Sequence, residues 1–121
     1  MQFAQKNFYK KLLGRAGEQK ATKYLKKLGY KILEKNYTTH LGEIDIIVKD
    51  GETIVFVEVK TRKDDLYGLP SQAVNYKKQE KYFAVATEYL VKNKLTDAVC
   101  RFDVVEICQE KINHIIDAFC M

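Results

Sequence analysis

Residues 42–62, GEIDIIVKDGETIVFVEVKTR, contain the pattern that decides the fold. Ile44–Val48 and Thr53–Val59 are rich in β-branched and aromatic side chains, which favour strands. Asp50-Gly51-Glu52 lies between them, and a glycine after an aspartate is typical of a tight hairpin turn. The sequence therefore predicts two antiparallel strands joined by a short turn.

The two faces of this predicted hairpin differ in polarity, because side chains alternate between faces along a strand. One face is apolar and consists of Ile44, Ile46, Val48, Val55, Val57 and Val59. The other face carries Glu43, Asp45, Ile47, Lys49, Ile54, Phe56, Glu58 and Lys60. Its carboxylates gather at the end that lies away from the turn.

The sequence leaves two registers open for the hairpin. With a two-residue turn at 50–51, Asp45 lies opposite Phe56. With a turn centred on residues 51–52, Asp45 lies opposite Glu58. Directly opposed residues share a face, so the face assignments are the same in both registers.

Helices are predicted on both sides of the hairpin in the sequence. Apolar residues recur at helical spacing in 8–28 and 71–93, and lysines occupy the opposite helix faces. Glu18 lies at the edge of the first apolar stripe, so we expect its carboxylate to point toward the sheet. Further strands are predicted at 30–37, 102–107 and 112–119.

The predicted order of elements is α-β-β-β-α-β-β, which indicates an α/β protein with a mixed sheet flanked by helices. The chain has 121 residues, and domains typically contain about 100–150. We therefore expect a single domain that spans residues 1–121.

The net charge of +5 is distributed unevenly along the chain. Segments 1–36 and 77–94 carry net charges of +8 and +3, whereas segments 37–76 and 95–121 carry −3 each. Lysines often do no more than solvate helix faces. The alternative is a surface that binds a polyanion around a site rich in carboxylates.

We expect a soluble cytoplasmic protein. No apolar run approaches the roughly 18 residues of a membrane helix, and the first residues lack the apolar core of a signal peptide. Cys100, Cys108 and Cys120 are odd in number and form no Cys-x-x-Cys pair, which argues against a disulfide framework. A zinc site that includes His114 is an alternative, but the spacings match no common zinc pattern.

Glu43, Asp45, Glu58 and Lys60 form the most informative candidate site. Opposed like charges destabilise a sheet, so this cluster suits a divalent cation or cations from elsewhere in the chain. A Mg²⁺ held by Asp45 and Glu58 would keep several waters and bind a phosphate oxygen. Lys60 would hold or polarise the attacking water, or stabilise the pentacovalent phosphorus. The pattern favours phosphodiester hydrolysis, and a solvated salt-bridge face is the alternative.

Asp45, followed on the next predicted strand by Glu58-Val59-Lys60, is similar to the signature of the PD-(D/E)xK nuclease superfamily, with Ile44 in place of the proline. Over nearly its whole length the chain resembles the YraN family of bacterial endonuclease-like proteins. The matching residues are Gly17-Glu18, Tyr24-Leu25, Asn36, Gly42–Asp45, Val55–Lys60, Arg62, Gly68, Lys78-Gln79, Lys81, Arg101–Asp103 and Ala118-Phe119.

The resemblance implies a restriction-endonuclease-like fold and a Mg²⁺ site, in which Mn²⁺ is expected to substitute. The ligands that it implies are Asp45, Glu58, the carbonyl of Val59 and, as in the branch related to Holliday-junction resolvases, Glu18. It also implies that Lys60 is the catalytic lysine. Gln79 matches an accessory catalytic position, and an amide packed within the helix stripe is the alternative.

We expect nucleic acid, and DNA in particular, as the partner. The residues expected to contact it are Lys20, Lys23, Lys27, Arg62, Lys77, Lys78 and Lys81. Three functions stay open: a Mg²⁺-dependent endonuclease that is selective for DNA structure, a non-catalytic nucleic-acid-binding module, and an interaction protein. A homodimer is one way to cut two strands.

Two further charge pairings are expected. Glu43 should form a salt bridge with Lys60 or Arg62. Arg101 and Asp103 are two residues apart on one predicted strand, so they share a face and are expected to pair.

Overall fold

The computed structural model describes residues 2–62 and 75–120, with side chains from residue 14 onward. The predicted loop that begins at Lys63 and the predicted helix start at residue 71 lie outside these residues. The elements are α1 (Gln2–Lys27), β1 (Lys31–Thr39), β2 (Gly42–Asp50), β3 (Thr53–Arg62), α2 (Tyr76–Lys92), β4 (Cys100–Cys108) and β5 (Lys111–Phe119). No helix in the described ranges is long and apolar enough to cross a membrane.

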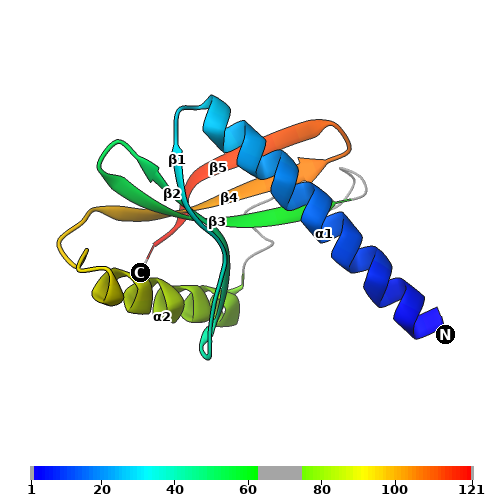
Figure 1. The fold of residues 1–121 in the computed structure, drawn as a ribbon, viewed down its shortest axis with the longest axis horizontal. Coiled ribbons are helices and arrows are strands. Elements are labelled where there is room, and N and C mark those ends of the chain that lie inside the picture. The colour runs from blue at the N-terminus through cyan, green and yellow to red at the C-terminus, as the bar shows by residue number, and fades with distance from the viewer. Residues whose placement is uncertain (1, 63–74, 121) are drawn as a thin grey trace.

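The five strands form one mixed sheet with the spatial order β1-β2-β3-β4-β5. β3 and β4 run parallel, and every other neighbouring pair is antiparallel. α1 crosses one face of the sheet and α2 covers the other, as Figure 1 shows. This α-β-β-β-α-β-β order and the mixed sheet between helices confirm the predicted fold class.

The β2–β3 hairpin adopts the second of the two predicted registers. Asp50 pairs with Thr53, and the regular pairs continue as far as Ile46 and Val57. Gly51 occupies the first turn position with a φ of +59°, in the left-handed region that glycine adopts at little cost. The turn is therefore centred on residues 51–52, which aligns Asp45 with the region of Glu58.

Each face of the sheet carries its own apolar core. The core under α1 contains Ala21, Leu25, Ile46, Val48, Val55, Val57, Val105 and Ile107. The core under α2 is built around Ile47, Ile54, Phe56, Tyr82, Val85, Ala86, Tyr89, Phe102 and Val104. Ile44 belongs to the second core, so its predicted place beside Ile46 and Val48 is wrong. The regular alternation of β2 fails between Ile44 and Ile46, where Asp45 lies.

Gly17 sets the distance between α1 and the sheet. A Cβ atom at this position would overlap the Oγ1 of Thr61 on β3 and would lie 3.8 Å from Val59 Cγ1. The missing side chain lets the helix lie close to β3, and it places the next residue, Glu18, over the open end of the β2–β3 hairpin.

A buried polar network joins β4 and β5 to the second half of α1. Asp103, which has no exposed surface, accepts hydrogen bonds from Arg101 Nε at 3.0 Å and from the Asp117 N–H at 2.9 Å. Nε2 of His114 lies 2.8 Å from Asp103, and Nδ1 lies 3.1 Å from the Tyr24 hydroxyl. The predicted Arg101–Asp103 pair is confirmed, and His114 contacts an acid and a tyrosine. The three cysteines are reduced thiols.

The contact between Gly17 and Thr61 generates a stability prediction. Alanine at a helix position is favoured over glycine by roughly 1 kcal/mol, but in the wild-type protein this gain is opposed by the overlap with Thr61. We expect Gly17→Ala to be neutral or destabilising in the wild type and stabilising by about 1 kcal/mol in a Thr61→Ala background. Urea unfolding of the four proteins measures the coupling, and additive effects would contradict it.

Candidate functional site

The site lies where β2 and β3 separate, beyond the last regular pair of the hairpin. The carboxylate of Asp45 accepts a hydrogen bond from the backbone N–H of Val59, with Oδ2 at 2.8 Å. A side chain of β2 therefore bonds to a β3 N–H that would otherwise point toward the β2 backbone. In a strand, the N–H and C=O of one residue point toward the same neighbour, so we expect the Val59 carbonyl to face this gap as well.

Glu18, Glu43 and Asp45 come together from α1 and β2. Each offers a carboxylate oxygen, and the three oxygens lie within 4.8 Å of one another. Glu18 and Asp45 are half-buried, whereas Glu43 is exposed. This confirms the orientation that the helix pattern predicted for Glu18. The expected salt bridge of Glu43 with Lys60 or Arg62 is not found among the described residues, where Lys60 contacts Glu58 and Arg62 contacts Glu106.

The environment of Asp45 disfavours its charged form. Burial raises the pKa of its carboxyl group to about 6, and the charges of Glu58, Glu18 and Glu43 act in the same direction. The hydrogen bond from Val59 opposes these effects only in part. The surroundings of Asp45 therefore supply too little positive charge to offset what burial and the neighbouring acids cost its ionised form.

Glu58 lies apart from this acidic group and has two lysines as partners. Only 3% of its surface is exposed, and its Oε1 is 2.5 Å from Lys78 Nζ and 3.4 Å from Lys60 Nζ. Its Oε2 is buried and has no hydrogen-bond partner among the described residues. Burial, followed by the nearby Glu58 charge, raises the pKa of the Tyr82 hydroxyl on α2. Glu58 thus contacts two ammonium groups through one oxygen, and its other oxygen is without a hydrogen-bond partner in the part of the chain that the structure describes.

The two lysines that contact Glu58 differ in their pKa. Burial and the adjacent Lys78 lower the pKa of Lys60. Burial acts in the same direction on Lys78, but Glu58 outweighs it and raises the pKa of that ammonium group. Lys60 is therefore the one that gives up its proton more easily.

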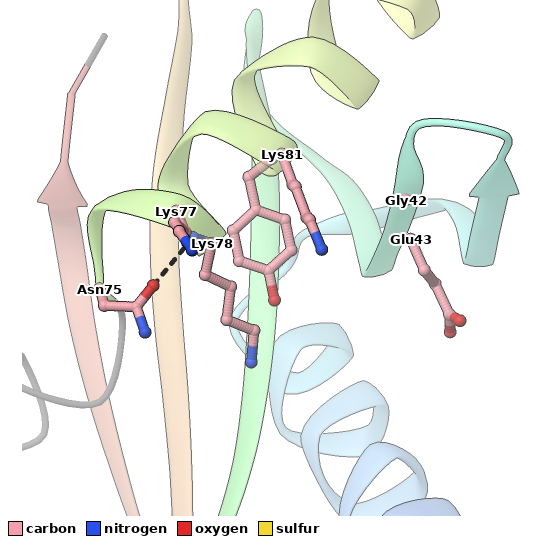
Figure 2. Close-up of a pocket in the computed structure, with 7 residues that line it drawn as sticks. Gly42, Glu43, Asn75, Lys77, Lys78 and Lys81 are labelled. Carbon is pink, nitrogen blue, oxygen red and sulfur yellow. Dashed lines mark hydrogen bonds between the residues drawn. The ribbon is translucent and has the colours of Figure 1, made fainter.

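The predicted nucleic-acid-binding residues are divided among three places. Lys77, Lys78 and Lys81 line a pocket of about 450 Å³ at the start of α2, together with Gly42, Glu43, Asn75 and Tyr82. Figure 2 shows the ammonium groups of Lys78 and Lys81 on the same side of α2, while Glu43 extends from β2 to one side of them. Lys20 lies 3.8 Å from Glu110, and Lys23 and Lys27 are exposed on the second half of α1. Arg62 pairs with Glu106 at 3.2 Å.

Of two further residues, Gln79 was predicted to belong to the site and Glu106 was not. Gln79, predicted as an accessory residue, is half-buried on α2 and is not part of the lining of the pocket. Glu106 was not predicted, yet it is buried next to Lys60 on β4, and its Oε2 has no hydrogen-bond partner in the described part of the chain. The sequence could have indicated this burial, because strand alternation places Glu106 on the same apolar face as Phe102 and Val104.

Comparison with known proteins identifies the family. A model of the uncharacterised protein family UPF0102 matches residues 17–107. The chain belongs to this family. The matched segment includes every site residue described above, and membership confirms the resemblance to the YraN family.

Relatives from several bacteria match this UPF0102 chain over most of its length. The UPF0102 protein of Alkaliphilus oremlandii is 51% identical over 115 residues, which are 90% of this chain and 98% of that protein. That of Thermodesulfovibrio yellowstonii is 51% identical over 107 residues, or 88% and 95% of the two chains. That of Caldicellulosiruptor saccharolyticus is 46% identical over 108 residues, or 89% and 92%.

The raised pKa of Asp45 predicts how stability depends on pH. Its carboxyl binds a proton more tightly in the folded protein than in the unfolded chain, so folding loses stability as the pH rises from about 4 to about 6. Asp45→Asn removes the charge and keeps an oxygen for the Val59 N–H. We expect this variant to exceed the wild type in stability by on the order of 2–3 kcal/mol above pH 6, and by almost nothing at pH 4.

Urea unfolding in the presence of EDTA, at pH 4 and at pH 7.5, measures this difference. Asp97→Asn is the matched control, because Asp97 is exposed and lies away from the acidic group. A stability difference between Asp45→Asn and wild type that is the same at both pH values would contradict the expected environment of Asp45.

Proposed function

We propose that this protein is a divalent-metal-dependent nuclease of the PD-(D/E)xK type, which hydrolyses phosphodiester bonds in DNA. The observation that carries the proposal is the junction of Asp45 with Glu58-Val59-Lys60. Asp45 accepts the Val59 N–H at 2.8 Å, so the two parts of the sequence signature are in direct contact. A helix glutamate, Glu18, lies beside them.

The residues present fit Mg²⁺ by charge and by donor chemistry. Glu18, Glu43 and Asp45 form one acidic group and Glu58 lies near it, and in the described residues the cations that contact these acids are Lys60 and Lys78, both at Glu58. Four carboxylates against two ammonium groups leave a net charge of −2, which one divalent cation would neutralise. All the available donors are oxygens, which Mg²⁺ prefers, and Mn²⁺ accepts the same set. Asp45, Glu18, Glu58 and the Val59 carbonyl would hold the ion.

The roles of the side chains follow from the chemistry of phosphodiester hydrolysis. A water oxygen forms a bond to phosphorus and loses a proton, while the ester P–O bond breaks and its leaving oxygen takes up a proton to become a hydroxyl. A bound metal ion supplies charge neutralisation at the phosphate and acidifies the water. Lys60, whose pKa is lowered by burial and by Lys78, is suited to hold the attacking water or to accept its proton.

Basic side chains beside the acids support a polyanionic substrate. Lys77 and Lys81 are exposed and line the pocket that adjoins Glu43, so a phosphate backbone would meet cations next to the carboxylates. Such contacts raise affinity without reading sequence. DNA is the proposed substrate, and single-stranded and branched forms are the first to test.

A non-catalytic nucleic-acid-binding module is the second candidate. One observation favours it: Glu58 is paired with Lys78 and Lys60 and is not part of the group formed by Glu18, Glu43 and Asp45. If this pairing persists when nucleic acid binds, the protein binds DNA through its lysines without cleaving it.

A cleavage assay with Mg²⁺ or Mn²⁺ distinguishes these functions. We expect the wild type to cut single-stranded or branched DNA, and Glu58→Gln and Lys60→Met to lose at least roughly a hundredfold in rate. EDTA should abolish cleavage. Labelled DNA and RNA substrates resolved on denaturing gels give the rates.

Glu52→Gln is the matched control, because Glu52 is exposed at the hairpin turn, away from the site. Equal cleavage by wild type, Glu58→Gln and Lys60→Met would indicate a contaminating nuclease. Salt-sensitive DNA binding without metal-dependent cleavage would favour the second candidate.

A further inference from the structure

The pocket at the start of α2 has the composition of a phosphate site. Its lining contains three lysines, Lys77, Lys78 and Lys81, and one carboxylate, that of Glu43. The wall beside them is the backbone of Gly42, where a Cβ would lie 3.4 Å from Val85 and 3.7 Å from Lys81. Gly42 therefore lets β2 pack closely against α2 beside the lysines, and lysine ammonium groups bind phosphate as point charges.

Glu43 and Lys78 connect this pocket to the proposed metal site. Glu43 lines the pocket and also belongs to the group formed with Glu18 and Asp45. Lys78 lines the pocket, yet its ammonium group lies against Glu58 at 2.5 Å. Its side chain is 39% exposed, whereas that of Glu58 is 3% exposed. Lys78 can therefore leave Glu58 for the solvent side, but Glu58 cannot follow it.

We infer that Lys78 exchanges partners when the protein binds its substrate. It moves from Glu58 to a backbone phosphate of the nucleic acid in the pocket, and Glu58 is thereby released to bind the metal ion. This inference rests on the proposed function and adds a coupling between its two ligands: the phosphate removes the ammonium group that competes with the metal for Glu58.

Lys60 does not make this exchange, because its surroundings differ. It contacts the same Oε1 at 3.4 Å, and it is not part of the lining of the pocket. It therefore remains beside Glu58 when Lys78 leaves, which keeps one cation next to the buried carboxylate. Glu58 Oε2 has no hydrogen-bond partner among the described residues. Both oxygens of the Glu58 carboxylate can therefore act as donors to the ion once Lys78 has left.

The exchange predicts opposite changes in two affinities for one variant. Lys78→Met removes the competing cation, so we expect Mg²⁺ to bind at least about fivefold more tightly, measured by isothermal titration calorimetry on the protein alone. The same variant loses a phosphate contact. We expect weaker binding of fluorescein-labelled dT12 in EDTA, measured by anisotropy, and a salt dependence reduced by about one charge.

Two other lysine variants act as comparisons. Lys81→Met should weaken dT12 binding and leave Mg²⁺ affinity within twofold of wild type, because Lys81 lines the pocket without an ion pair to Glu58. Lys92→Met, at the far end of the same helix, should change neither affinity. If Lys78→Met fails to fold, Lys78→Gln removes the charge and keeps a hydrogen-bond donor for Glu58, and the same two measurements apply.

The outcomes separate this inference from the proposed function. If wild type binds neither Mg²⁺ nor dT12, the proposed function fails. If wild type binds both, and the Lys78 variants bind Mg²⁺ no more tightly, the exchange is overturned and the nuclease proposal stands. Weaker binding of both ligands by these variants would mean that Lys78 only maintains the structure, which also overturns it.

Discussion

Repulsion among carboxylates at the open end of the β2–β3 hairpin is the constraint on which the surrounding structure depends. Asp45 is stabilised by one backbone N–H, from Val59, and this bond forms where the regular pairing of the hairpin has stopped. Glu58 is stabilised by Lys78 from α2. Glu18 reaches the same place only because Gly17 allows α1 to lie against β3. Both helices are thus positioned around one set of acids.

Much of the fold was predictable because burial imposes periodicity on the sequence. The order of the elements, the turn and the inward orientation of Glu18 all follow from spacing. Periodicity fails where the backbone is irregular, so Ile44 lies in the other core from the one predicted. It also fails at the ends of helices. Leu28 and Tyr76 continue apolar stripes but are 47% and 84% exposed, since Leu28 follows the last turn of α1 and Tyr76 begins α2.

The candidate site was predictable only in part, because a pattern shows where a side chain points and not what it meets. The motif indicated Asp45 and Glu58, which the structure places at the same end of the hairpin. It could not indicate that Lys78, twenty residues after Glu58, reaches this carboxylate from another element. Tertiary packing decides such a contact. The position of Glu106 beside Lys60 on the neighbouring strand likewise depends on a parallel β3–β4 register that the sequence did not specify.

Two aspartates in the same sheet, Asp103 and Asp45, show what is unusual about the site. Asp103 is fully buried, and burial alone would raise its pKa, yet hydrogen bonds from His114, Arg101 and the Asp117 N–H lower it. Asp45 is less buried but has one such bond and three acidic neighbours, and its pKa rises to about 6. The fold can therefore supply enough donors to hold a buried carboxylate in its charged form, and it does so at Asp103. At Asp45 it brings further carboxylates instead, an arrangement that gains stability from an added cation.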